Sequence, residues 1–284
     1  MLALLFATGV TQAVPNTHGA SPQFAIDYDS SVAGSLCYVD ASATAGGNTG
    51  ASWSDAYIDL QSALGDTNCT EVWVAAGVYK PGTQATDSFV VAAGVAVYGG
   101  FAGSETTRSQ RVPGIDTTVL SGDIDSNDNL DANGVDVDYS DIQGTNSYTV
   151  VTMDGRTQAI GADTVLDGFT ITGGDAQGSF PLHSGGGGLL CLAYLSGVCS
   201  PSLSNLEFSG NNSGDVGGAI YALGNGGSTS PSFDAVTFRG NHAQTDGGAM
   251  YLDGGGGGTS NATLSNVTFN GNQADGNGGA LYNQ

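Results

Sequence analysis

One pattern is repeated three times in the last third of the chain, and this repeat constrains the fold more than any other sequence feature. Each copy carries Phe-x-Gly-Asn, and nine residues after each Phe comes Gly-Gly-Ala-aliphatic-Tyr. The repeated positions are Phe208, Asn211, Gly217 and Gly218; Phe238, Asn241, Gly247 and Gly248; and Phe269, Asn272, Gly278 and Gly279. The phenylalanines are 30 and 31 residues apart. A fixed period with fixed internal spacing predicts a solenoid, in which each repeat is one coil.

The third copy shows how one coil would be built. In the segment LSNVTFNGN (264–272), Val267 and Phe269 alternate with Thr268, so a strand would place them on one face. We expect the path to bend at Asn266, and Gly271 with Asn272 to form a corner, because both residue types tolerate left-handed backbone. Equivalent side chains would lie about 4.8 Å apart on adjacent parallel strands. The phenylalanines would then stack in the core, and the asparagines would form a hydrogen-bonded ladder.

Short strand-like segments without helices between them extend this pattern toward the N-terminus. Examples are EVWVAAGVY, TTVLSGD and YTVVTMD, which are rich in β-branched residues and bounded by Gly or Asn-Asp breaks. A degenerate copy covers 166–174, where Ile171 takes the place of Phe, and GGGLL (186–190) takes the place of GGALY. We therefore predict an all-β parallel β-helix.

One segment near the start has helical spacing. Apolar residues in SWSDAYIDLQSALGD recur at intervals of three and four from Trp53 to Leu64. Ser52 or Ser54 could cap the start of this helix, and Gly65 could end it. A lone amphipathic helix before a run of strands suits the N-terminal cap of a solenoid.

The charge of the chain excludes two classes of partner. Five basic residues stand against 27 acidic ones, which gives a net charge of −22. Nucleic acids and anionic membrane surfaces are therefore not expected as partners, because both are bound through Lys and Arg. The apolar run in residues 1–13 ends in Thr-Gln-Ala and is typical of a secretory signal without a basic start. It is too short to span a bilayer, so we expect no membrane span in this segment.

Four cysteines fit a secreted protein with two disulfides. Cys37, Cys69, Cys191 and Cys199 allow three connectivities. Proximity in the sequence favours Cys191–Cys199 and leaves Cys37–Cys69. The connectivity is otherwise open.

An alternating series of oxygen-bearing side chains makes DIDSNDNLD (123–131) a candidate calcium loop. Its ligands would be Asp123, Asp125, Asn127, Asn129 and Asp131. The sixth and twelfth positions carry Asp128 and Gly134 in place of the Gly and Glu of an EF-hand, so the loop is not an EF-hand. The alternative is a polar surface excursion that binds nothing. Calcium is the one cofactor that the sequence suggests.

The repeats resemble those of known surface proteins. The FxxN and GGA[ILM] motifs resemble the repeats of chlamydial polymorphic outer membrane proteins. Segments such as EVWVAAGVYKP, VAVYGGFAGSET and LDGFTITGG are similar to the N-terminal part of secreted β-helix proteins of the pectin-lyase-like superfamily. This resemblance implies a right-handed, single-stranded β-helix in an extracellular or outer-surface protein.

The resemblance also organises the chain. We expect a signal-like segment at 1–13, a flexible leader at 14–35, the cap and first coils at 36–165, and repeats at 166–284. Because such proteins continue through further coils, we expect the repeats to be truncated at the C-terminus.

Two functions follow from this class, and the first is preferred. The first is a non-enzymatic surface scaffold, of the adhesin or passenger type, whose partners are host or environmental surface glycans or proteins. The second is a polysaccharide lyase or related enzyme with its catalytic coils downstream. Lyases of this fold need a basic residue beside calcium-binding carboxylates. The basic residues here, such as Arg156 and Arg239, do not recur at matching repeat positions. No catalytic residue is therefore assigned.

Overall fold

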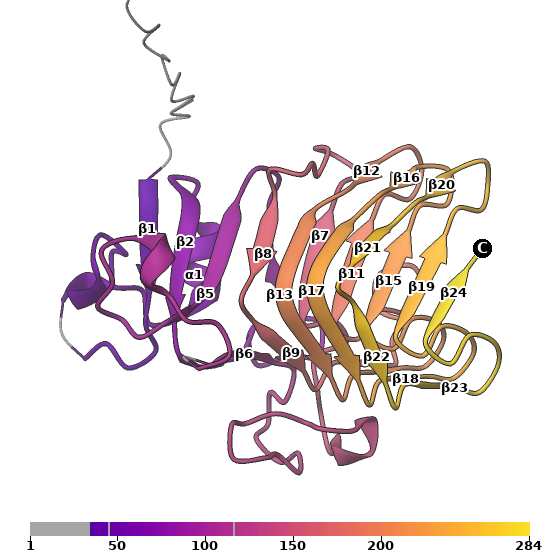
Figure 1. Ribbon diagram of the computed structural model, residues 1–284, viewed down its shortest axis with the longest axis horizontal. Helices are drawn as coiled ribbons and strands as arrows, with labels where there is room; N and C mark the ends of the chain where they lie inside the picture. The colour runs from indigo at the N-terminus through magenta and orange to yellow at the C-terminus, as the bar shows by residue number, and fades with distance from the viewer. Residues whose placement is uncertain (1–34, 45, 116) are drawn as a thin grey trace, which may run out of the picture. The chain divides into compact units, whose positions relative to one another are not determined.

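The parallel β-helix is confirmed by the computed structural model, which describes residues 35–44, 46–115 and 117–284. Within these ranges the coils stack along the chain from the first strands to the last (Figure 1). Each pairing between two assigned strands is parallel and joins one coil to the next. The signal-like segment 1–13 and the leader 14–35, except for Ser35, lie outside the described residues.

The largest sheet of the described residues has 11 strands and runs the length of the solenoid. Its strands are β1 (Ser35–Val39), β2 (Cys69–Ala75), β3 (Gly77–Tyr79), β5 (Ala96–Phe101), β6 (Thr118–Ser121), β8 (Val165–Asp167), β9 (Thr170–Thr172), β13 (Ser202–Ser209), β17 (Ser232–Arg239), β21 (Thr263–Ser265) and β22 (Thr268–Asn270). The pair β13 and β17 is the longest, and Phe208 faces Phe238 in it.

Three smaller sheets form the other sides of the coils. One contains β4 (Phe89–Val90), β7 (Val151–Asp154), β11 (Leu189–Leu192), β15 (Ile220–Leu223), β19 (Met250–Asp253) and β24 (Leu281–Asn283). A second contains β10 (Asp175–Ala176), β14 (Asn212–Ser213), β18 (His242–Ala243) and β23 (Gln273–Ala274). The third contains β12 (Val198–Cys199), β16 (Ser228–Thr229) and β20 (Thr259–Ser260).

The predicted capping helix is present but shorter than the sequence suggested. Helix α1 covers Leu60–Gly65, and its start is capped by Asp59, whose side chain accepts a hydrogen bond from the Ser62 backbone N–H. Prediction of Ser52 or Ser54 as the cap was wrong, because Trp53–Asp55 form a separate 3-10 turn, η1. Between the two, Tyr57 exchanges backbone hydrogen bonds with Tyr38 and Asp40, so pairing with β1 overrides the helical spacing.

The bends and corners of each coil depend on residues with positive φ. The predicted bend at Asn266 has φ +53°, and the equivalent Asn205 and Ala235 have φ +50° and +55°. At the next corner only the glycine is left-handed: Gly271 has φ +66°, whereas Asn272 is not among the residues with positive φ. The predicted corner is therefore present, with the glycine supplying the left-handed backbone and the asparagine supplying its side chain to the ladder.

The interior of the solenoid is a continuous apolar core. It extends from Cys37 and Val39 in the first coil to Ala249 and Met250 near the last, and most of its members are fully buried. The strands therefore depend on stacking with their neighbours, as expected for a solenoid whose single coils cannot bury their own apolar faces.

Candidate functional site

The repeated Phe and Asn residues form two internal columns. The rings of Phe208 and Phe238 stack with centroids 5.1 Å apart, and those of Phe238 and Phe269 with centroids 5.0 Å apart. In the ladder, Asn211 Nδ2 donates to Asn241 Oδ1 at 3.0 Å, and Asn241 Nδ2 donates to Asn272 Oδ1 at 2.8 Å. These side chains therefore contact one another inside the solenoid, and they are not available to bind a ligand.

The paired glycines of each repeat are required for two different reasons. The first of each pair is left-handed, with φ +63° at Gly217 and +70° at Gly247. The second is approached by neighbouring backbone, since a Cβ on Gly248 would lie 2.1 Å from Gln273 O and 2.2 Å from Gly279 O. A side chain at the first position would strain the backbone and clash within its own coil, and a side chain at the second would displace the next coil.

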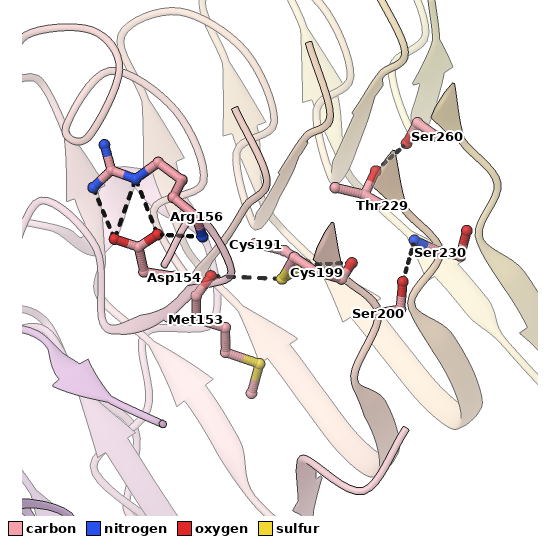
Figure 2. Close-up of a disulfide and its surroundings, with 9 residues drawn as sticks. All are labelled: Met153, Asp154, Arg156, Cys191, Cys199, Ser200, Thr229, Ser230 and Ser260. Carbon is pink, nitrogen blue, oxygen red and sulfur yellow. Dashed lines mark hydrogen bonds and ion pairs between the residues drawn. A yellow bond between two sulfur atoms is a disulfide. The ribbon is translucent and has the colours of Figure 1, made fainter. Parts of the chain in front are cut away.

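The cysteines pair as the sequence spacing favoured. Cys37–Cys69 joins β1 to β2, and Cys191–Cys199 joins β11 to β12 inside one coil. Figure 2 shows the second bridge, where Thr229 and Ser260 occupy the position of Cys199 in the next two coils. Thr229 Oγ1 donates to Ser260 Oγ at 2.7 Å, so a hydrogen bond succeeds the disulfide along the same corner. Both disulfides are structural.

A long excursion leaves the solenoid between β6 and β7, and it contains the candidate calcium loop. We define the excursion as residues 122–147; it includes the 3-10 turn η3 (Tyr139–Asp141) and projects beside β9 in Figure 1. Its outer part is docked on the repeats through Tyr139, whose N–H donates to Gly240 O and whose ring stacks on His242 at 4.2 Å. Tyr139 could not be identified from the sequence, because it follows no motif and its partners Gly240 and His242 lie about a hundred residues away.

The five predicted calcium ligands are directed to different places in this excursion. The side chains of Asp125 and Asn127 lie together beside Gly144. Asp131 Oδ1 accepts hydrogen bonds from its local backbone, at Asn133 N and Val135 N. The remaining two positions are Asp123, which is fully buried at the base, and Asn129, whose backbone N–H donates to Asp141 O. Throughout the described ranges, no three His, Cys, Asp or Glu side chains are placed to share a metal ion.

A different group of polar side chains converges at the base of the excursion. Asn146 Nδ2 donates to Asp128 Oδ2 at 2.6 Å and to Gly173 O at 2.7 Å, and Asp136 Oδ2 accepts from Thr172 Oγ1 at 3.2 Å. Burial and the neighbouring carboxylate of Asp128 raise the pKa of Asp136 to about 7. Burial also raises the pKa of Asp128. We refer to Asp128, Asp136 and Asn146 as the basal cluster.

An open groove runs over the outer face of the largest sheet, next to the excursion. One part of the groove has a volume of about 240 Å³, and the adjoining part about 170 Å³. The floor carries outward side chains that face one another on successive strands, Thr170, Glu207 and Thr237. The walls come from outside the repeats: Pro113 and Gly114 on one side, and Asp131, Asn133 and Val135 of the excursion on the other.

The basic residues of the chain are each paired with a carboxylate. The pairs are Lys80–Asp123, Arg108–Glu71, Arg111–Asp167, Arg156–Asp154 and Arg239–Glu207. Arg239 lies in the groove, where its Nη2 is 2.8 Å from Glu207 Oε1, and its side chain is 35% exposed. The groove thus presents the Arg239–Glu207 pair and a second carboxylate, Asp131, among hydroxyl and amide groups.

His242 is the residue of the repeats on which the ring of Tyr139 stacks. It lies in β18 and is 8% exposed, with Nδ1 2.9 Å from Asn212 Oδ1 and Nε2 3.3 Å from Asp275 Oδ1. Its position in the strand could have been inferred from the alignment of the three repeats, in which Asn212 and Gln273 occupy the same place.

Comparison with known proteins supports the class that the fold and the columns define. Residues 205–223 and 266–284 match the Chlamydia polymorphic membrane protein repeat. The matched segments carry Phe208 and Phe269 with their Asn and Gly-Gly partners. The chain is therefore a parallel β-helix with coils similar to those of polymorphic membrane proteins. No curated protein and no solved structure gives a match to this chain.

Among the described residues, no helix combines the length and apolarity that a membrane-spanning helix needs.

Proposed function

We propose that this chain is a non-enzymatic cell-surface scaffold that binds surface glycans through the groove beside the excursion. The observation that carries the proposal is that the repeated residues and the groove walls are different parts of the chain. The repeated Phe and Asn side chains contact one another inside the solenoid, whereas the groove walls come from segments outside the repeats. Binding specificity therefore resides in the parts that the repeat leaves free to vary.

Several properties favour a surface partner over other classes. The repeats are similar to those of a membrane-protein family of Chlamydia, which supports display at an outer surface. A net charge of −22 opposes binding to nucleic acid and to anionic lipid. An open groove lined by hydroxyl and amide groups suits a sugar chain, which is recognised by many hydrogen bonds of modest strength.

The chemistry of the groove specifies the kind of glycan. Thr170, Thr237 and Asn133 supply uncharged donors and acceptors. Arg239 is neutralised by Glu207 at 2.8 Å, so a strongly anionic polysaccharide would meet a carboxylate beside the only guanidinium that lines the groove in the described structure. We therefore expect neutral or weakly charged glycans, and not polyuronates, as ligands.

The direct test is binding of the purified chain to a panel of immobilised neutral and acidic glycans. Arg239→Ala should weaken binding at least tenfold, because it removes a donor and leaves Glu207 unpaired in the groove. Arg156→Ala is the matched control: its arginine is also 36% exposed and paired with a carboxylate, but it lies outside the groove. Equal loss in both variants, release of soluble sugar from the panel, or a preference for polyuronates would contradict the proposal.

A further inference from the structure

Unpartnered oxygen atoms gather at the base of the excursion. Seven buried side-chain atoms in the described residues have no hydrogen-bond partner, and among them are Asp136 Oδ1, Asn146 Oδ1 and Asp123 Oδ2. Asp123 and Asp136 are fully buried, and Asn146 is 4% exposed. A buried oxygen without a partner costs about 1–3 kcal/mol, and more for a charged group. Such a concentration in one place indicates a bound partner, either ordered water or a cation.

The basal cluster converges on one point. A Cβ placed on Gly173 would lie 2.7 Å from Asp136 Oδ2, 3.3 Å from Asp128 Oδ2 and 3.4 Å from Asn146 Nδ2. The Gly173 carbonyl oxygen also faces this group, since it accepts from Asn146 Nδ2 at 2.7 Å. The left-handed glycine, with φ +67°, leaves room that any side chain would fill.

The charge of the basal cluster is not balanced by the surrounding protein. Asp128 and Asp136 repel each other, and Asp123 adds a third negative charge nearby. Lys80 is 3.6 Å from Asp123 Oδ2, and the other four basic residues are paired with carboxylates other than Asp128 and Asp136. A half-buried carboxylate and a fully buried one, close together in surroundings of reduced dielectric constant, attract a cation strongly.

We propose that the basal cluster binds one Ca²⁺ ion between Asp128 and Asp136. The remaining protein ligands would be neutral oxygens, the Asn146 side chain and the Gly173 carbonyl, because no third carboxylate is placed to share the ion. With the ion bound, a half-turn of the Asn146 amide would exchange its N and O atoms, so that Oδ1 faces the ion in place of the hydrogen bonds from Nδ2 to Asp128 and Gly173. Two carboxylates with carbonyl and amide oxygens form a donor set suited to calcium. It contains neither the sulfur nor the nitrogen ligands typical of zinc.

The ion would fasten the excursion to the solenoid at its base. Asp128 and Asp136 belong to the excursion, whereas Gly173 follows β9 in the coil. Residues between those two carboxylates, Asp131, Asn133 and Val135, form one wall of the groove. Calcium would thus hold that wall in place, independently of whether the groove binds a glycan.

The test is calcium titration of the full chain by calorimetry, with thermal melting in calcium and in chelator. Wild type should bind one Ca²⁺ and melt at a higher temperature in calcium. Asp136→Asn should weaken calcium binding more than tenfold. In chelator at pH 7.5, the melting temperature of this variant should be no lower than that of wild type, because the substitution removes a repulsive buried charge. Such a melting temperature would show that the variant folds.

Asp125→Asn is the matched control. Asp125 belongs to the alternating set, but its carboxylate accepts a hydrogen bond from the Thr145 N–H and is not a proposed ligand, so this variant should weaken calcium binding less than threefold, through its charge alone. If Asp125→Asn loses calcium while Asp136→Asn keeps it, the alternating loop is the site and the proposal is overturned. The proposal is equally overturned if wild type binds no Ca²⁺ at millimolar concentration, which would leave ordered water as the partner of these oxygens.

Discussion

Replacing Phe238 by alanine removes the middle ring of the three-ring column. The ring is fully buried and lies between Phe208 and Phe269, at centroid distances of 5.1 and 5.0 Å. Truncation of a buried Phe costs about 3–5 kcal/mol through lost transfer free energy and the cavity that remains. Loss of two stacked pairs, each contributing about 0.5–1.5 kcal/mol, places this site near the upper end of that range.

The measurement is urea unfolding followed by circular dichroism, with Phe269→Ala as the matched control. Phe269 is only partly buried in the described structure, so its truncation should destabilise the protein by less than half as much. With a urea m-value on the order of 3 kcal/mol/M, Phe238→Ala should lower the midpoint by more than about 1 M. If the coils unfold separately, hydrogen exchange should accelerate first in β17 and β22.

A specific result would refute the stacked core. If the midpoint of Phe238→Ala stays within about 0.2 M of wild type, the ring does not support the column and the burial argument fails. Equal losses for Phe238→Ala and Phe269→Ala would show that position along the column does not matter, which contradicts the difference in burial.

Three further perturbations test other parts of the structure. Asn241→Ala should cost at least about 2 kcal/mol in chemical unfolding, because it leaves buried partners on both neighbouring coils unsatisfied; a change below 0.5 kcal/mol would contradict the ladder. In chelator, the free energy of unfolding should fall as the pH rises from 4 to 7, by up to about 1.4 kcal/mol per pH unit, because the folded state holds a proton on Asp136 that the unfolded chain has released. Asp136→Asn should flatten this slope. An unchanged slope in that variant would show that another group causes it. Removing Cys37–Cys69, which closes 32 residues, should destabilise more than removing Cys191–Cys199, which closes 8, by about 1 kcal/mol in the chain-entropy description; the reverse order would indicate that local strain decides.

The parts of the fold that could be predicted were those with a repeated local cause. The residue types at Phe238, Asn241 and Gly248 recur because each coil needs the same side chain at the same position, so one sequence displays the requirement three times. For these repeated residues the partner lies one period away, and the period is visible in the sequence. The observed disulfide pairing is the one that proximity in the sequence favoured, although the connectivity was otherwise open.

The parts that could not be predicted depend on contacts made once. Helix α1 is short because Tyr57 pairs with β1, and nothing in the helical spacing indicates that competition. The alternating Asp and Asn residues suggested calcium ligands by their spacing, but Asp131 turns to its own backbone. Asp136 and Asn146 were missed because only the folded excursion brings them to Asp128, and they follow no motif.

The in-register columns have a consequence for how such a chain can change length. Ser209 and Arg239 face each other on β13 and β17, so removing residues 210–239 would join two points that are already equivalent in the coil. The cross-section, the corner glycines and the ladder would be unaltered, and the rod would shorten by about 4.8 Å, the spacing between strands. This particular deletion would also remove Thr237 and Arg239 from the groove, whereas gain or loss of whole coils away from the groove would change the length of the rod and leave the binding surface as it is.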